Sequence, residues 1–160
     1  MKINHFSNFI LLLFLVLSCE NNSVKPNLCD VETEADVWGE CYNIETTTYL
    51  YRYDERPPST LPSELFRLIN LEQLGLAQQN LIGEIPPEIE NLTNLEVLIL
   101  DNNSLSGSLP SQIWNLSNLR NLFLHRNELS GELSSDISNL TNLHYLSLSH
   151  NDFSGELPSE

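Results

Sequence analysis

Basic residues are scarce in this chain: 7 lysines and arginines stand against 22 aspartates and glutamates among 160 residues, a formal charge of −15. Only Lys2 and Lys25 are lysines. Because phosphate binding needs a basic patch, this balance argues against a nucleic-acid partner and against docking on anionic lipid through the protein surface. Long apolar runs are also absent, since the longest, residues 9–17, falls far short of the ~20 residues that span a bilayer.

The first nineteen residues have the features of an export signal. A weakly positive start, an apolar stretch and a small residue predict a secretory signal peptide over residues 1–18. The residues Val16-Leu17-Ser18-Cys19 resemble the lipobox of bacterial lipoproteins, and this resemblance implies that Cys19 is lipidated. Cleavage after Ser18 without lipidation and an uncleaved anchor are the alternatives. Residues 19–28 are polar and contain Pro26, so we interpret them as a tether.

Three cysteines are present, and lipidation of Cys19 would leave Cys29 and Cys41 as an even pair. In an exported, oxidising context such a pair predicts a disulfide. Two unpaired thiols remain the alternative, and a zinc site is disfavoured because the nearby segment has no histidine. We expect residues 29–48 to form an N-terminal cap whose many carboxylates are a solvated acidic face.

The rest of the chain repeats itself every 24 residues, without insertion or deletion, from about Tyr49 to Glu160. Two leucine columns are Leu74, Leu98, Leu122 and Leu146, then Leu76, Leu100, Leu124 and Leu148. Behind them follow a polar column and a glycine column: Gln79, Asn103, Asn127 and Asn151, then Gly83, Gly107, Gly131 and Gly155. Residues 49–160 therefore comprise about five units, the first degenerate and the last incomplete.

The unit Asn-Leu-x-x-Leu-x-Leu-x-x-Asn-x-Leu-x-Gly-x-Leu-Pro, seen in residues 94–110, resembles the plant-specific type of leucine-rich repeat. This resemblance implies an α/β-type solenoid, a horseshoe fragment with a short parallel β-sheet on its concave face and 3₁₀ or irregular turns on its convex face. Similar repeats occur in plant receptor ectodomains, polygalacturonase inhibitors and bacterial surface proteins. The stretch Trp38-Gly39-Glu40-Cys41 also resembles the end of that family's N-terminal cap.

Each column has a physical role in such a coil. Alternation in Leu74-Gly75-Leu76 predicts one short strand per unit, with its leucines pointing inward. We expect Asn103, Asn127 and Asn151 to form a ladder that bonds backbone groups left unpaired where strand turns into loop. Gln79 interrupts this ladder and could reach similarly. The glycine column suits a backbone with positive φ or a close approach.

The outward strand positions form the candidate ligand-binding surface, because related proteins bind ligands on the concave face. We expect an exposed aromatic and aliphatic patch there, beside a polar group in which Asp101 and His125 are neighbours. Coverage of the tyrosines by the cap is the alternative. A metal held by Asp101, His125 and His150 is far less expected than ordinary polar positions. The predicted binding residues are Tyr49, Tyr51, Tyr53, Val97, Ile99, Asp101, Phe123, His125, Arg126 and Tyr145.

No catalytic motif is present in the sequence, so we expect neither an enzyme nor a cofactor or metal. The leading hypothesis is an extracellular module that binds protein or glycan through its concave face, anchored at the cell envelope by lipid or otherwise secreted. The alternatives are a secreted enzyme inhibitor resembling the polygalacturonase inhibitors and a self-associating structural surface protein. Because the last unit stops at Glu160, we expect either a longer protein or edge-to-edge pairing with another copy.

Overall fold

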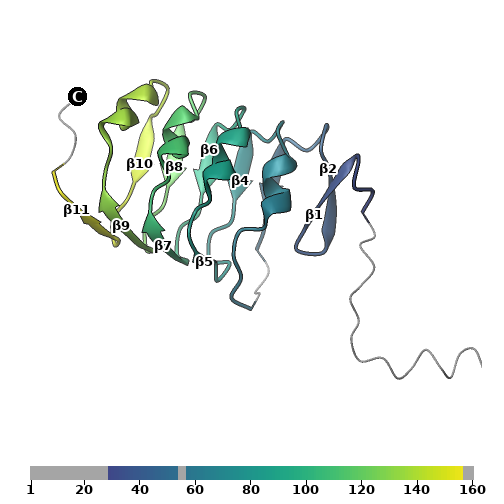
Figure 1. Ribbon diagram of the computed structural model, residues 1–160, viewed down its shortest axis with the longest axis horizontal. Helices are drawn as coiled ribbons and strands as arrows, with labels where there is room; N and C mark the ends of the chain where they lie inside the picture. The colour runs from purple at the N-terminus through teal and green to yellow at the C-terminus, as the bar shows by residue number, and fades with distance from the viewer. Residues whose placement is uncertain (1–28, 54–56, 157–160) are drawn as a thin grey trace, which may run out of the picture.

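The computed structural model describes residues 29–53 and 57–156. The predicted signal peptide, the predicted lipidation site Cys19 and the predicted tether lie outside these residues. In the described ranges, no helix is long and apolar enough to cross a membrane. The repeats stack into a solenoid with the cap at one end, which confirms the predicted fold class (Figure 1).

The main sheet takes one short strand from each unit. All its strands are parallel, and each pairs with the strand 24 residues further on, so that Tyr49, Gln73, Val97, Asn121 and Tyr145 lie side by side. The strands, in spatial order, are β3 (Tyr49–Tyr51), β4 (Gln73–Gly75), β6 (Val97–Ile99), β8 (Asn121–Phe123) and β10 (Tyr145–Ser147). The repeat register thus becomes the sheet register.

The inward leucines form a continuous core along the solenoid. Leu98, Leu100, Leu122 and Leu124 are fully buried, because each coil covers the leucines of its neighbour. Leu146, in the last described coil, is 39% exposed.

In the described ranges, four units also have a second strand and four have a 3₁₀ turn. The second strands form another parallel sheet, which the sequence analysis did not predict: β5 (Ile82–Gly83), β7 (Ser104–Ser108), β9 (Glu128–Glu132) and β11 (Asp152–Ser154). The 3₁₀ turns are η1 (Ser63–Arg67), η2 (Pro87–Asn91), η3 (Ser111–Asn115) and η4 (Ser135–Asn139). Glycines at 83, 107, 131 and 155 have φ between +77° and +85°, as the sequence predicted for this column.

Two ladders of asparagine side chains form hydrogen bonds between successive coils. In the inner ladder, Asn127 donates to the carbonyls of Leu100 and Leu124 and accepts from the Leu105 N–H, at 3.0–3.1 Å. An outer ladder, not anticipated from the sequence, has one bond per coil from each asparagine amide to a carbonyl of the preceding coil. These bonds, of 2.9–3.1 Å, come from Asn70, Asn94, Asn118 and Asn142.

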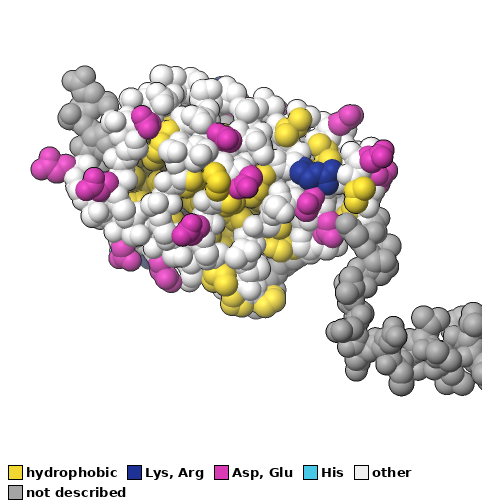
Figure 2. All heavy atoms as spheres, viewed as in Figure 1, with side chains coloured by type: hydrophobic (Ala, Val, Ile, Leu, Met, Phe, Trp, Pro, Cys, Tyr) yellow, Lys and Arg dark blue, Asp and Glu magenta, His cyan; other side chains and the backbone are white. Residues whose placement is uncertain are grey.

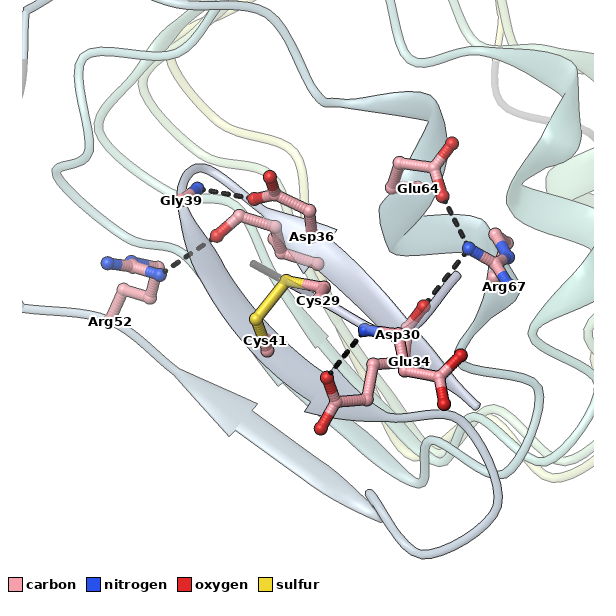
Figure 3. The surroundings of a disulfide bond; sticks show 10 residues. Cys29, Asp30, Glu34, Asp36, Gly39, Cys41, Arg52, Glu64 and Arg67 are labelled. Atoms are coloured by element: carbon pink, nitrogen blue, oxygen red, sulfur yellow. Dashed lines mark hydrogen bonds and ion pairs between the residues drawn. A yellow bond between two sulfur atoms is a disulfide. The ribbon is translucent and has the colours of Figure 1, made fainter. Parts of the chain in front are cut away.

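The cap is an antiparallel hairpin, β1 (Glu34–Val37) and β2 (Glu40–Asn43). Cys41 of β2 and Cys29, which precedes the hairpin, form the predicted disulfide (Figure 3). The buried Ala35 and Val37 join the core of the repeats. Arg67 of η1 donates to the carbonyls of Glu34 and Val31, which fastens the hairpin to the first turn.

Acidic side chains are scattered over the face of the molecule seen in Figure 2, where basic side chains are few. The second strands and the 3₁₀ turns contain acidic residues such as Glu88, Glu90, Glu128 and Glu132. By contrast, the predicted concave-face residues include a single carboxylate, Asp101, and it is buried. The acidity of the chain is therefore concentrated away from the candidate site.

Candidate functional site on the concave face

The outward residues of the main sheet lie in columns, one residue from each coil. Parallel pairing aligns Tyr51 with Gly75, Ile99, Phe123 and Ser147. Backbone bonds between coils continue past the strands, as in the Asn102 N–H to the His125 carbonyl, at 3.0 Å. A rigid, hydrogen-bonded backbone therefore positions every side chain of the candidate site.

The three tyrosines at the cap end are exposed. The exposed fractions are 69% for Tyr49, 38% for Tyr51 and 85% for Tyr53. The alternative in which the cap covers them is wrong, because the cap packs through Ala35 and Val37 against the core and leaves the sheet surface open.

The Tyr51 ring packs on the sheet over Gly75, its neighbour on β4, because glycine has no side chain. A Cβ built on Gly75 would fall 2.2 Å from Tyr51 Cδ1, so glycine is what leaves room for the ring. The Tyr51 hydroxyl donates to Gln73 Oε1 at 2.8 Å, which holds the ring in place. The Tyr53 ring is nearly parallel to it, with the centroids 6.3 Å apart. Burial, and then the nearby Tyr53, raise the pKa of Tyr51 above 10.0.

Val97, Ile99 and Phe123 are half-buried in the middle of the face. They form an apolar area that is less exposed than the three tyrosines. Tyr145, on β10, is 64% exposed at the far end of the same sheet.

A polar network crosses the face beside this apolar area. His125 Nδ1 lies 2.7 Å from Asp101 Oδ1, which also accepts the His125 N–H at 3.0 Å. Asn102 Nδ2 lies 3.5 Å from His125 Nε2, and Arg126 donates to Asn102 Oδ1 at 3.4 Å. Burial raises the pKa of Asp101, while His125 opposes this through its charge and hydrogen bonds. With 8% of Asp101 exposed, this residue positions His125 and presents little surface to a ligand.

The network lacks the parts that hydrolytic chemistry needs. An aspartate–histidine pair activates a nucleophile only when a hydroxyl or thiol bonds the second ring nitrogen. Here that nitrogen faces the Asn102 amide, and no hydroxyl or thiol of the described residues bonds it. Asp101, His125 and His150 are likewise not gathered as a metal-ligand group in the described ranges. The group that is gathered there is Cys29, Glu34 and Cys41, whose sulfurs are joined as the disulfide.

The structure adds Arg52, which the sequence analysis left without a role. Arg52 occupies an inward leucine position and is 5% exposed. It pairs with Glu40 at 2.8 Å, donates to the Val37 carbonyl and the Tyr42 hydroxyl, and lies over the Trp38 ring. The signal in the sequence was an arginine in a leucine column, which requires a partner because a buried charge must be paired.

The residues three positions after the ends of β4, β6, β8 and β10 have an unexpected backbone conformation. Gln78, Asn102, Arg126 and His150 all have φ between +55° and +58°. This left-handed turn ends the strand and aims these side chains differently from those of the preceding columns.

Comparisons with known proteins give one family. The leucine-rich repeat region family matches residues 58–159. No curated protein shows significant similarity to this chain.

Among solved structures, the chain is similar to ectodomains of plant receptors. One is the ectodomain of the receptor kinase GASSHO1/SCHENGEN3 from Arabidopsis thaliana, in complex with CASPARIAN STRIP INTEGRITY FACTOR 2 (33% identity, TM-score 0.63), covering 66% of this chain and 13% of that one. Another is the Arabidopsis receptor kinase HAESA, in complex with the peptide hormone IDA and the co-receptor SERK1 (33%, 0.63), covering 66% and 18%. A third is a plant ice-binding protein (33%, 0.60), covering 66% and 34%. The chain thus spans a small part of the length of these neighbours.

Proposed function

We propose that this chain, which belongs to the leucine-rich repeat family, is a non-enzymatic extracellular module that binds a protein-type ligand on its concave face. The observation that carries the proposal is the in-register surface of Val97, Ile99 and Phe123 beside the Asp101–His125 pair. Apolar area flanked by oriented polar groups is the usual composition of a protein interface. The neighbours solved with a peptide hormone and a co-receptor support the same reading.

The concave face suits this role because its backbone is already ordered. Each strand is hydrogen-bonded to its neighbours, so binding would cost little backbone entropy. The predicted binding residues include a single carboxylate, the buried Asp101, so this face avoids the repulsion that the acidic remainder of the surface would impose on acidic ligands.

A peptide-selection experiment tests the proposal. Peptides from a random phage-displayed library are selected on the immobilised full-length chain, and their affinities are measured by calorimetry. Phe123→Ala should weaken them about tenfold or more, as for an anchor residue in an interface. The matched control is Glu88→Ala, an exposed residue of η2, which should leave the affinities unchanged. Equal losses in both variants would refute the concave-face assignment.

We also propose that the protein is exported and held at the envelope through lipid on Cys19. The lipobox-like sequence and the Cys29–Cys41 disulfide, typical of oxidising compartments, support export. Intact-mass spectrometry of protein from its own host's membranes tests this. A chain that starts at Cys19 with added acyl mass agrees with the proposal, whereas an unlipidated chain that starts near Cys19 would show free secretion.

A further inference from the structure

We propose that Tyr51 and Tyr53, at the junction of the cap and the first repeats, form a binding site for a neutral carbohydrate chain. This site adds a second class of ligand to the proposed function. It rests on the proposed function in one respect, because it uses the cap end of the same concave face.

The first argument is the presentation of the aromatic rings. The two rings are nearly parallel, at 9°, and both are open to solvent. Sugar rings bind proteins by placing their C–H bonds over aromatic faces, whose π-systems are negative. Tyr51 is pre-positioned by Gln73 and by the space over Gly75, so little side-chain entropy is lost on binding.

The second argument is that hollows lie on both sides of the tyrosine pair. On the cap side, a hollow of about 330 Å³ is lined by Glu40, Tyr42, Arg52 and the two tyrosines. On the repeat side, Tyr53 borders a second hollow of about 420 Å³. A chain of several sugar units could therefore pass the tyrosines and remain in contact on either side.

The third argument is the chemistry of the lining. The second hollow is lined by Tyr53, Ala77, Gln78, Gln79 and Asn80. Gln79 is 4% exposed, and its Oε1 accepts no hydrogen bond in the described part of the chain. Amides, a carboxylate and a guanidinium around aromatic rings match the hydroxyl-covered rim of a sugar.

The fourth argument concerns charge and selects a neutral glycan. Arg52 is already paired with Glu40, so the junction offers no unbalanced cation to an acidic sugar. The formal charge of −15 also repels polyanions. A peptide is less suited to this site, because the mostly apolar hollow beside Ile99 measures only about 120 Å³ and at least half of the lining of the two larger hollows is polar.

Calorimetry on the full-length chain, in a detergent without a sugar headgroup, tests the proposal. The probes are the neutral oligosaccharides cellohexaose and laminarihexaose and the acidic hexagalacturonate. At least one neutral probe should bind, and more tightly than the acidic probe. Tyr53→Ala should raise its Kd about tenfold or more, whereas Tyr53→Trp should retain binding. Tyr53 is 85% exposed, so its replacement leaves the core untouched.

Tyr145→Ala is the matched control, because it removes the same exposed side chain from the far end of the same sheet. Its Kd for the sugar should stay within about twofold of wild type. The proposal is overturned if no neutral probe binds, if the acidic probe binds best, or if both tyrosine variants lose binding equally. It is also overturned if Tyr53→Ala abolishes binding of the library-selected peptides while sugars do not bind.

Phe123→Ala separates this inference from the proposed function. It should weaken the selected peptides and leave sugar binding intact. If sugars bind and Phe123→Ala does not affect the peptides, the protein-ligand proposal alone fails. If the peptides depend on Phe123 and no sugar binds, the carbohydrate site alone fails.

Discussion

Asn103 shows how much one side chain holds together in this fold. Its amide donates to the carbonyls of Leu76, Leu100 and Asp101, and its oxygen accepts the N–H groups of Gln79 and Leu81. These groups belong to two successive coils, at the point where strand pairing ends. Because a backbone group buried without a partner is costly, this asparagine is needed wherever the coil bends.

Asn103→Ala should therefore lower the free energy of unfolding by about 3 kcal/mol, since several backbone groups lose their partner together. Asn118→Ala is the control: it removes a single exposed bond, and should cost about 1 kcal/mol or less. Urea unfolding followed by circular dichroism measures both. Similar losses in the two variants would show that the inner ladder has no special role.

The break in this ladder at Gln79 has a local cause. Each ladder asparagine accepts the N–H of the residue 22 positions earlier, as in Leu105 to Asn127 and Leu129 to Asn151. For Gln79 that residue is Pro57, which has no N–H. The Gln79 side-chain nitrogen instead donates to the carbonyls of Ala77 and Gln78. Its side-chain oxygen accepts no hydrogen bond from the described residues.

The Asp101–His125 pair predicts a specific response in an NMR titration. Burial raises the pKa of Asp101 above 3.8, and the charge and hydrogen bonds of His125 offset only part of this rise. His125→Ala should therefore raise the Asp101 pKa further, while His150→Ala should not change it. A pKa that falls in His125→Ala would contradict the assigned contacts.

The same raised pKa sets the sign of the stability change. The folded state binds this proton more tightly than the unfolded chain does. The contribution of Asp101 to stability is therefore complete below 3.8 and declines as the pH rises through the folded pKa.

At the scale of the element, the cap hairpin depends on its disulfide and on two arginines from the repeats. The cysteines are 12 positions apart, so their bond closes a short loop. Replacing both in Cys29→Ser/Cys41→Ser should lower the free energy of unfolding by about 3 kcal/mol in the loop-entropy model. Thermal unfolding of the variant against reduced wild type checks this, because the two should unfold at similar temperatures.

Strand β4 offers a second test at this scale. Gly75→Ala places a methyl group where the Tyr51 ring lies, and the exposed ring can swing away. We expect a loss of about 1 kcal/mol in unfolding free energy and weaker sugar binding. Ser147→Ala, at the equivalent position of β10, is the control and should change neither. Unchanged sugar binding in Gly75→Ala would show that the Tyr51 position is unimportant.

For the whole molecule, net charge is the main electrostatic property. With a formal charge of −15, self-repulsion destabilises the compact state at neutral pH. Raising NaCl from about 0.01 M to about 0.15 M shortens the Debye length roughly from 30 to 8 Å and should raise the melting temperature. Near the isoelectric point of about 4.4, where net charge vanishes, the same salt should have little effect. An equal shift at both pH values would point to a cause other than charge.

The main repeat columns and the cysteine pair could be predicted from the sequence, whereas the second sheet, the outer ladder and the partners of Arg52 could not. The columns of Leu74 and Leu76 predicted the sheet register, and cysteine counting predicted the disulfide. The second sheet could not be predicted because its short strands, such as β7, contain serine and glycine and do not alternate apolar with polar residues over their length. The partners of Arg52 come from the cap, which occurs once and therefore leaves no repeating pattern.

The sequence alone determined the solenoid, because a 24-residue repeat without gaps allows only one way for each coil to cover the leucines of the next. Only the tertiary structure decided which outward residues are available. It buried the Asp101 carboxylate, placed Tyr51 over Gly75 and left Tyr53 exposed between two hollows. The physical reason is that these outcomes depend on side-chain packing between one coil and a unique neighbour, and no periodic pattern in the sequence encodes such a contact.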